Sequence, residues 1–504
     1  MKPILKRTLT SVAVAAALVT APLANATNGY FKIGYGSKNR GMAGAGMAFG
    51  QDSLAASVNP AALAGMGNRV DAGVELFSPS QREGQVDATG MATPDFGNGP
   101  RQGADSRETS GATVFAIPNF GITMDMGNDM TFGLAVVANG GMNTRYGSAN
   151  GGTGNIYMSA FGPVVGDTST GNFGGQAGFA GFLEFQGVPA AVMDPNLQTL
   201  YTNPNNTPSL GINLSQVLIT PTIAYKINQN HSVGFAPVIA YQRFRAYGLG
   251  LFQAFSSDPG NVTNNGDDQS WGYGARVGYQ GDFGMVSIGA SYTSKLNMEA
   301  FDNYAGLFAE KGDFDIPSTF GVGLAIRPTS SLTIAVDWTR INYSEIAAIN
   351  NAGPTADEFF SAFVGALTGN PAAISNPLGT NDGWGFGWED VNVIKVGINY
   401  MYNSKWTFRA GYNFSESPYD DDQALFNVLA PAVVQKHATV GFTYSPTTTS
   451  ELTVAYMHAF RESLDYDYVG GNTVPASGDF TGFNFSAAQA MSQNAIEASY
   501  AWKF

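Results

Sequence analysis

Apolar and polar side chains alternate with a period of two along most of this chain, beginning near residue 69. Because successive side chains of a strand point to opposite faces, each alternating run predicts a strand with one apolar and one polar face. About fourteen such runs can be distinguished, which is an even number, as single-chain bacterial barrels require. The runs lie near 69–79, 112–126, 130–142, 212–227, 231–247, 271–281, 284–296, 316–327, 331–345, 389–402, 405–415, 435–445, 450–461 and 491–504.

The run at the end of the chain, Ala495 to Phe504, has the clearest pattern. Its apolar face consists of Ile496, Ala498, Tyr500, Trp502 and Phe504. A strand of about ten residues with interfacial aromatic side chains and a terminal Phe is typical of outer-membrane barrels, although a soluble edge strand has a similar pattern. The sequence therefore favours a strand that faces lipid on one side.

The segments between the runs alternate in length, which strengthens the barrel prediction. One set consists of short turns rich in Gly, Asn, Asp, Pro and Ser, such as Gly127–Asp129 and Asn228–Asn230. The other set is long: 80–111, 143–211, 248–270, 297–315, 346–388, 416–434 and 462–490. Short periplasmic turns opposite long extracellular loops characterise outer-membrane barrels, whereas a soluble sandwich has no reason to segregate its loops. We predict an all-β fold, an antiparallel transmembrane barrel over residues 69–504.

Alternation also assigns the faces of the strands. A basic side chain on the lipid face near the midplane costs about 2–4 kcal/mol, so the favoured registers place the strand cations in the lumen. These cations are Arg276, Lys295, Lys395 and Arg409. Since an unpaired buried charge is very costly, we expect each either to bind the carboxylate of a ligand or to pair with a lumen acid such as Asp337.

Two segments precede the first run. Lys2, Lys6 and Arg7, an apolar stretch to Leu23 and an Ala24-Asn25-Ala26 cleavage site predict a signal peptide over 1–26. No later window has about 18 uninterrupted apolar residues, so no transmembrane helix is expected. Residues 27–68 are rich in Gly and Ala without a long alternating run, and we predict that they form a compact plug.

One long loop has a helical pattern. Thr355 and Glu358 match a capping box, and Phe359, Phe360 and Phe363 follow at helical spacing. The pattern predicts a short amphipathic helix in an extracellular loop. Its apolar face either packs on its own loop or forms a surface groove where a hydrophobic ligand first binds.

Composition narrows the possible functions. Loss of the signal peptide, with its three cations, takes the net charge from −14 to −17, which makes nucleic acid a poor partner. The chain has no Cys, and His231, His437 and His458 lack metal-ligand spacing. Gly44-Ala45-Gly46 does not continue as a nucleotide-binding glycine loop, and no nucleophile elbow is present. A catalytic pair at the rim, such as His458 with Asp465, has no feature that selects it. We expect no metal, no cofactor and no enzymatic activity.

Two parts of the sequence resemble the FadL family of outer-membrane transporters. The stretch N-G-Y-F-K-I-G-Y-G-S-K-N-R-G-M-A-G-A-G-M-A at 28–48, followed by Gln51–Leu54 and Asn59-Pro60-Ala61, is similar to the family's N-terminal hatch. Trp388-Glu389-Asp390 and Arg409–Asn413 resemble its C-terminal half. The match covers essentially the whole mature chain, although the loop 143–211 departs from the family in length. These proteins carry long-chain fatty acids and related hydrophobic compounds, including toluene.

The resemblance implies a mechanism and a set of partners. Family members are monomeric fourteen-stranded barrels of the Gram-negative outer membrane, plugged by a hatch that here corresponds to 27–68. Ligand binds apolar outer loops, passes to a pocket against the hatch and leaves through a lateral opening at a kink in the third strand. The implied gating residues are Gly29, Tyr30, Asn59, Pro60, Ala61, Gly140 and Gly141.

Gly140-Gly141 either supplies that kink or marks an ordinary strand end. The expected partners are a hydrophobic small molecule, outer-membrane lipid and lipopolysaccharide, and the barrel-insertion machinery. Monoaromatic or alkane cargo remains open beside fatty acids. A diffusion porin lacks such a plug, and a TonB-dependent receptor has 22 strands, too many for this chain.

Overall fold

The structure is a computed structural model that describes residues 28–89, 107–147, 155–157, 209–359, 361–362, 374–469 and 484–504. The predicted signal peptide and most of the loop 143–211 lie outside the described residues. Within the described ranges, no helix is both long enough and apolar enough to cross a membrane.

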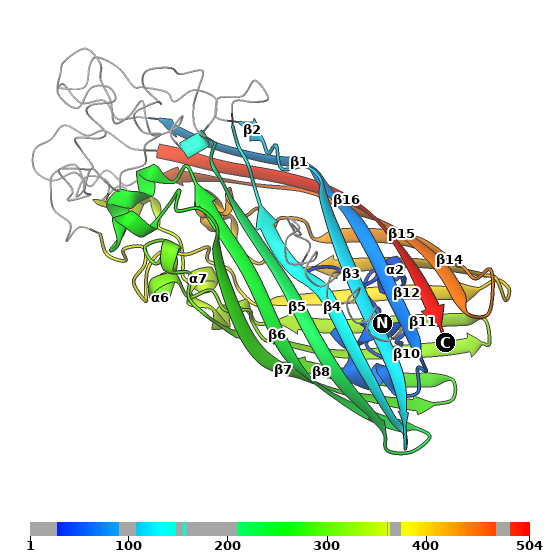
Figure 1. Ribbon diagram of the computed structural model, residues 1–504. Helices are drawn as coiled ribbons and strands as arrows, with labels where there is room; N and C mark the ends of the chain where they lie inside the picture. The colour runs from blue at the N-terminus through cyan, green and yellow to red at the C-terminus, as the bar shows by residue number, and fades with distance from the viewer. Residues whose placement is uncertain are drawn as a thin grey trace, which may run out of the picture.

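Fourteen antiparallel strands form one closed sheet (Figure 1). They are β1 (Arg69–Thr89), β3 (Phe115–Gly127), β4 (Met130–Asn143), β5 (Gly211–Lys226), β6 (His231–Tyr247), β7 (Asp268–Phe283), β8 (Val286–Thr293), β10 (Thr319–Thr329), β11 (Leu332–Ile341), β12 (Val391–Met401), β13 (Trp406–Ser415), β14 (Lys436–Tyr444), β15 (Ser450–Val469) and β16 (Asn484–Lys503). Each strand pairs with the next, and β16 pairs back with β1, so the barrel has no open edge. The predicted barrel is confirmed. Two short strands, β2 (Glu108–Thr109) and β9 (Asn297–Met298), pair with β1 and β7.

Three strands are longer than the alternation predicts. β1, β15 and β16 continue about seven to ten residues past the expected strand ends, and β1 stays paired with β16 up to Thr89 opposite Asn484. A register irregularity between Ser78 and Gln81 marks the start of the extension. The residues beyond it are mostly polar on both faces, so their sequence has no lipid-facing stripe. The long loops and these extensions share one end of the barrel, here the loop end; the short turns define the turn end.

The predicted faces of the strands are confirmed where they alternate. On β11, Val336 is 42% exposed on the outer surface, whereas its neighbour Asp337 is 1% exposed and points inward. Tyr500 and Trp502 of β16, and Phe504 directly after it, are exposed on the outside, as the pattern predicts. The outer wall therefore presents apolar side chains, and the inner wall presents polar and small ones.

Residues 28–68, here the N-terminal segment, lie inside the barrel (Figure 1). They contain α2 (Ser37–Gly41) and two 3₁₀ helices, η1 (Ser53–Ser57) and η2 (Pro60–Leu63). Asn59 caps η2, since its side-chain oxygen accepts the Ala61 N–H at 3.1 Å, and Pro60 occupies the first helical position. The Asn59 amide also donates to the carbonyls of Met47 and Tyr279, at 2.8 and 3.0 Å. The N-P-A sequence thus fastens the segment to β7.

Glycines in the inner wall allow this close approach. A Cβ at Gly278 of β7 would lie 2.1 Å from the Asn59 Oδ1, and one at Gly289 of β8 would lie 2.0 Å from the Met47 carbonyl oxygen. No side chain fits at either position, so the wall backbone touches the Asn59 side chain at Gly278 and the Met47 backbone at Gly289.

Short helices fill the loop end. They are η5 (Gly250–Phe255), η6 (Pro259–Asn261), η7 (Asp302–Tyr304), α6 (Ala309–Gly312), η8 (Tyr343–Glu345), α7 (Ala347–Asn350), η10 (Asp421–Gln423) and α9 (Ala424–Asn427). Several bury large aromatic side chains, including Phe252, Tyr304 and Phe426. The loops therefore form an apolar cap over the barrel (Figure 1).

Candidate functional site

An apolar pocket, here the outer pocket, lies among the loops at the loop end. Every residue that lines it is apolar or glycine, including Phe244, Phe252, Phe308, Trp384 and Phe426. The rings of Phe252 and Phe426 meet edge to face, with their centroids 5.3 Å apart. A pocket lined by apolar side chains binds chiefly through the hydrophobic effect, which contributes about 0.8 kcal/mol per buried CH₂.

The predicted loop helix contacts this pocket indirectly. Its Phe359 packs on Phe255, and Phe255 packs on Trp384 of the pocket. The capping box is confirmed, because the Glu358 N–H donates to the Thr355 Oγ1 at 3.2 Å while the Glu358 carboxylate accepts the Thr355 N–H at 2.9 Å. Phe359 is buried, and its ring centroid lies 5.6 Å from that of Phe255 and 5.6 Å from that of Phe485. Phe359 is therefore buried against Phe255 of another loop and Phe485 of β16. Phe360 and Phe363 lie outside the described residues.

A column of aromatic rings, here the aromatic column, leads from the outer pocket to the N-terminal segment. Phe386 of the pocket lies 6.3 Å from Trp388, which lies 6.0 Å from Tyr30 (centroid distances). A second branch runs from Phe308 through Phe314 to Tyr30, at 4.8 and 6.4 Å. The residues come from three separate parts of the chain, and both branches meet at Tyr30.

Tyr343 holds Tyr30 at the base of the column. The Tyr343 hydroxyl donates to the Asn28 carbonyl at 2.7 Å and accepts the Tyr30 N–H at 3.3 Å. Gly29 has a φ of +65°, and a Cβ there would lie 2.3 Å from the Tyr343 Oη. Only glycine fits this position, because both the backbone conformation and the space exclude a side chain.

Tyr30 contacts the irregular part of β4. The register between β4 and β5 shifts between Ala138 and Gly140, which is the irregularity expected at the glycine pair. The Gly141 N–H donates to the Tyr30 carbonyl at 3.2 Å, and the Lys32 N–H donates to the Asn139 carbonyl at 2.9 Å. A Cβ at Gly140 would lie 1.9 Å from the Tyr30 carbonyl oxygen. The N-terminal segment thus runs beside β4 like a short extra strand.

The wall between β3 and β4 is incomplete at this height. The ladder between the two strands reaches only Phe120 opposite Val136. Beyond that pair, residues 137–143 of β4 bond to β5, and residues 115–119 of β3 bond to β1. We call this stretch the β3–β4 gap. Within this stretch no ladder pair between β3 and β4 is described, and the backbone of Tyr30 and Lys32 bonds to β4 beside it.

A second cavity, here the inner cavity, lies between the N-terminal segment and the wall. Phe31, whose ring stacks on Tyr30 at 5.1 Å, lines it together with Arg276 and Lys395. Arg276 donates to the Thr293 Oγ1 at 2.8 Å and to the Ala56 carbonyl at 3.2 Å, and Lys395 lies 3.4 Å from the Thr339 Oγ1. Two of the four expected lumen cations therefore face one cavity below the aromatic column.

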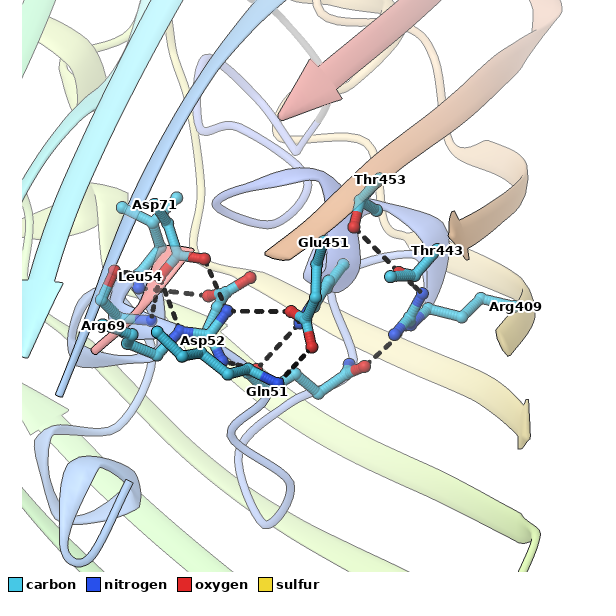
Figure 2. Close-up of polar contacts among 12 residues, drawn as sticks. Gln51, Asp52, Leu54, Arg69, Asp71, Arg409, Thr443, Glu451 and Thr453 are labelled. Carbon is cyan, nitrogen blue, oxygen red and sulfur yellow. Dashed lines mark hydrogen bonds and ion pairs between the residues drawn. The ribbon is translucent and has the colours of Figure 1, made fainter. Parts of the chain in front are cut away.

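The other two lie elsewhere. Arg409 points into the lumen as predicted, but it donates to the Gln51 Oε1 at 2.8 Å and to the Thr443 Oγ1 at 2.7 Å, away from the inner cavity (Figure 2). The prediction that Lys295 is an inward strand residue is wrong. β8 ends at Thr293, where the Ser294 hydroxyl accepts the Ala275 N–H and interrupts the alternation. Lys295 is 39% exposed and pairs with Asp315 at 2.7 Å.

Near the turn end, buried ion pairs join the N-terminal segment to the wall; we call them the lumen charge network. Lys32 and Arg40 both pair with Glu75 of β1, and Arg40 also approaches Glu497 of β16 at 3.5 Å. Figure 2 shows Arg69 between Asp71 and Glu451, at 2.6 and 3.3 Å; Glu451 also pairs with Lys38. The sequence contains a signal for this network that our prediction did not use. It consists of inward-facing acids on the strands and basic residues at 32–40.

Asp337 of β11 also contacts the N-terminal segment, but it has no cationic partner among the described ion pairs. Its Oδ2 accepts the N–H groups of Gly46 and Met47 at 2.7 and 2.8 Å. The expected pairing of Asp337 with a strand cation is therefore replaced by hydrogen bonds to the backbone of the N-terminal segment.

Comparison with known proteins places this geometry in a family. The family described as "Outer membrane protein transport protein (OMPP1/FadL/TodX)" matches residues 190–470. No curated protein sequence matches the chain.

Among solved structures, the Pseudomonas putida toluene transporter TodX is 16% identical, with a TM-score of 0.58 over 95% of this chain and 100% of that one. A Pseudomonas aeruginosa FadL homologue is 16% identical, with a TM-score of 0.56 over 94% and 100%. The Ralstonia pickettii toluene transporter TbuX is 16% identical, with a TM-score of 0.51 over 94% and 99%. At this identity the structures show a shared fold. The chain belongs to the OMPP1/FadL/TodX family of outer-membrane transport proteins, which is a transporter family and not an enzyme family.

Proposed function

We propose that this protein takes up hydrophobic small molecules, which bind in the outer pocket, descend the aromatic column and leave through the β3–β4 gap. One observation carries the proposal: a continuous run of apolar and aromatic contacts ends at the place where adjacent strands of the described wall are unpaired. A hydrophobic molecule that leaves there returns to lipid without crossing water.

In this proposal the N-terminal segment is the hatch that closes the lumen. Below Tyr30 and Phe31 the chain continues with Lys32 and the lumen charge network. An apolar ligand gains no burial among fixed charges, so its favourable route turns sideways at Tyr30. Residues 28–68 thus block the axial path and, through Tyr30, border the lateral one.

For the cargo, we propose long-chain fatty acids. Arg276 and Lys395 line the inner cavity, and neither makes an ion pair in the described part of the chain. Cations held in a lumen of low dielectric favour an anionic partner, and a carboxylate is the natural one. The alkyl chain of the same ligand matches the column above them.

Uncharged hydrocarbons are the second candidate. The outer pocket has no polar lining residue at all, and two of the similar structures, TodX and TbuX, are toluene transporters. This alternative needs no role for Arg276 or Lys395.

Replacement of Trp388 by Ala tests the route. The variant should lower uptake of any hydrophobic cargo about tenfold, equivalent to about 1.4 kcal/mol of lost apolar contact. Trp406→Ala is the matched control, since Trp406 lies on the outer face of β13. Uptake by cells that lack the native gene and carry each variant provides the measurement. Equal uptake by both variants would remove the aromatic column from the route.

Replacement of Arg276 and Lys395 by Ala, singly and together, separates the two cargoes. If fatty acids are the cargo, the double variant should weaken oleate binding but leave binding of an uncharged hydrocarbon nearly unchanged. Arg340→Ala, which removes a cation that already pairs with Asp390, is the control. Unchanged oleate binding would favour the hydrocarbon alternative.

A further inference from the structure

Three arginines gather on the outside of the barrel at the loop end of β4, β5 and β6. Arg243 and Arg245 alternate along β6 with the buried Gln242 and Phe244, so their side chains point outward. Arg145 follows the end of β4 and lines the same surface hollow. The three come from segments that converge only in the folded barrel; we call them the arginine cluster.

The hollow around the arginine cluster is otherwise uncharged except for one acid. Its lining consists of Gly111, Ala112, Asn143, Ser209, Asn213, Tyr247, Asn264 and Asp267 beside the arginines. The guanidinium of Arg245 lies 5.8 Å from the ring centre of Tyr247, whose hydroxyl donates to the Thr144 carbonyl at 2.8 Å. Asp267 is exposed and forms no described ion pair, so the hollow has an excess of two positive charges.

Other basic residues near the loop end differ from the arginine cluster because each of them has an acidic partner. Arg461 pairs with Glu83 at 2.8 Å, Lys436 with Glu462 at 2.8 Å, and Arg340 with Asp390 at 2.7 Å. Among the described residues, no carboxylate pairs with a member of the arginine cluster. In a chain with a formal net charge of −14, three adjacent cations without acidic partners form a surface suited to an anion.

The height of the cluster on the barrel points to a particular anion. On the outer face of β6, outward-pointing residues run from Val233 to Tyr241, which spans about 20 Å along the membrane normal at the usual strand tilt. Tyr241 packs on Trp271 of β7 with 4.9 Å between ring centroids, and Trp271 is 45% exposed. Arg243 follows two residues later, about 7 Å further along the strand. The cluster thus stands just above an aromatic belt, at the level of lipid headgroups.

We propose that the arginine cluster binds the phosphate groups of a glycolipid of the outer leaflet, which is lipopolysaccharide in this membrane. Guanidinium groups bind phosphate oxygens in bidentate fashion, and several cations in one hollow match a headgroup with more than one phosphate. The acyl chains of the same molecule lie along the apolar outer face of β6 and β7 below. Free phosphate shares the headgroup chemistry but has no use for that apolar face. The site lies outside the lumen and does not depend on the identity of the cargo.

The test measures glycolipid retention by the full-length protein in detergent. The protein is mixed with lipopolysaccharide or with its enzymatically dephosphorylated form, and bound glycolipid is counted by native mass spectrometry. The variant carries Arg145→Ala, Arg243→Ala and Arg245→Ala. A matched control carries Arg340→Ala, Lys436→Ala and Arg461→Ala, which removes three paired cations. Heat-modifiable gel mobility establishes that each barrel is folded.

We expect the wild type and the control to retain phosphorylated glycolipid at least about tenfold more tightly than the cluster variant, and dephosphorylation to abolish that difference. Equal retention by the cluster variant and the wild type would overturn the proposal. Complete displacement of the glycolipid by low-millimolar inorganic phosphate would identify a free-anion site instead. If the triple variant does not fold, Arg145→Gln and Arg245→Gln, which change exposed side chains only, decide by the same comparison.

Discussion

The two halves of the lumen differ in chemistry although one chain segment runs through both. Toward the loop end, Tyr30 and Phe31 contact a column of aromatic rings below a pocket with no polar lining. Toward the turn end, Lys32 and Arg40 pair with Glu75, and Arg69 pairs with Asp71 and Glu451. The change occurs within one residue, between Phe31 and Lys32.

This difference separates the tasks of the two halves. Apolar contact is weakly directional, so the outer half is able to accept ligands of varied shape. Buried ion pairs are directional, and removal of one partner leaves an uncompensated charge, so the inner half holds the N-terminal segment in one position. In the proposed route, a hydrophobic ligand would meet this fixed polar region just below Tyr30, beside the β3–β4 gap.

The largest expected effect follows from removal of the N-terminal segment from the lumen. Deletion of 30–66 should leave a heat-modifiable barrel that conducts ions, because the polar inner wall would then line an open pore. Single-channel recordings in planar bilayers measure this, with the full-length protein, which we expect to be nearly silent, as reference. If conductance does not rise, the N-terminal segment is not the plug.

Loss of a single carboxylate from the lumen charge network should have a large effect on stability. Glu75→Gln leaves Lys32 and Arg40 buried without their shared partner, and we expect a loss of about 3–5 kcal/mol in the free energy of unfolding. Urea unfolding in detergent or lipid provides the measurement. Glu83→Gln, which breaks the half-exposed pair with Arg461, should cost at most about 1 kcal/mol. Similar losses in both variants would mean that the buried pairs do not fasten the segment.

Gly140→Ala tests the boundary between the two halves. The new Cβ cannot occupy a position 1.9 Å from the Tyr30 carbonyl oxygen, so Tyr30 must move and the hydrogen bond from Gly141 should be lost. Uptake of hydrophobic cargo should change several-fold while the barrel stays folded. Gly127→Ala serves as a control for backbone strain without a clash, because φ at Gly127 is +71° but a Cβ in that turn meets no neighbouring atom within 4 Å. Normal uptake by Gly140→Ala would show that the contact with β4 plays no part in transport.

The smallest expected effect is a pH response in the loop beside the outer half. Burial, together with the nearby carboxylates of Asp315 and Glu310, raises the pKa of Asp313 to about 6. Since this pKa is raised above its unfolded value, the stability that Asp313 contributes is fully present below about pH 4 and is lost as the pH rises through about 6. The protection factors of the amides in 309–316, which are corrected for the intrinsic base-catalysed exchange rate, should therefore be higher at pH 5 than at pH 7.5. Asp313→Asn should remove the difference; if the difference persists, another group is responsible.

Local pattern determined much of this protein. The alternation around Val336 and Asp337 predicts both a strand and its faces, because the side-chain period of a strand depends on the backbone alone. Thr355 and Glu358 predict a helix start for the same reason, since a capping box joins residues three apart. The strand count and the loop asymmetry follow from summing such local signals along the chain.

Tertiary structure decided the features that join distant residues. The extensions of β1, β15 and β16 have no amphipathic stripe, because they are held by one another and not by lipid. Lys295 lies outside the lumen because the Ser294 hydroxyl accepts the Ala275 N–H and interrupts the regular strand. The alternation of apolar and polar side chains does not predict such a competition between hydrogen-bond acceptors. Tyr30 meets Tyr343 and Trp388, and Glu75 meets Arg40, only because barrel closure fixes which inward positions face each other across the lumen. Sequence sets the face on which a side chain lies, and closure of the sheet sets what stands opposite to it.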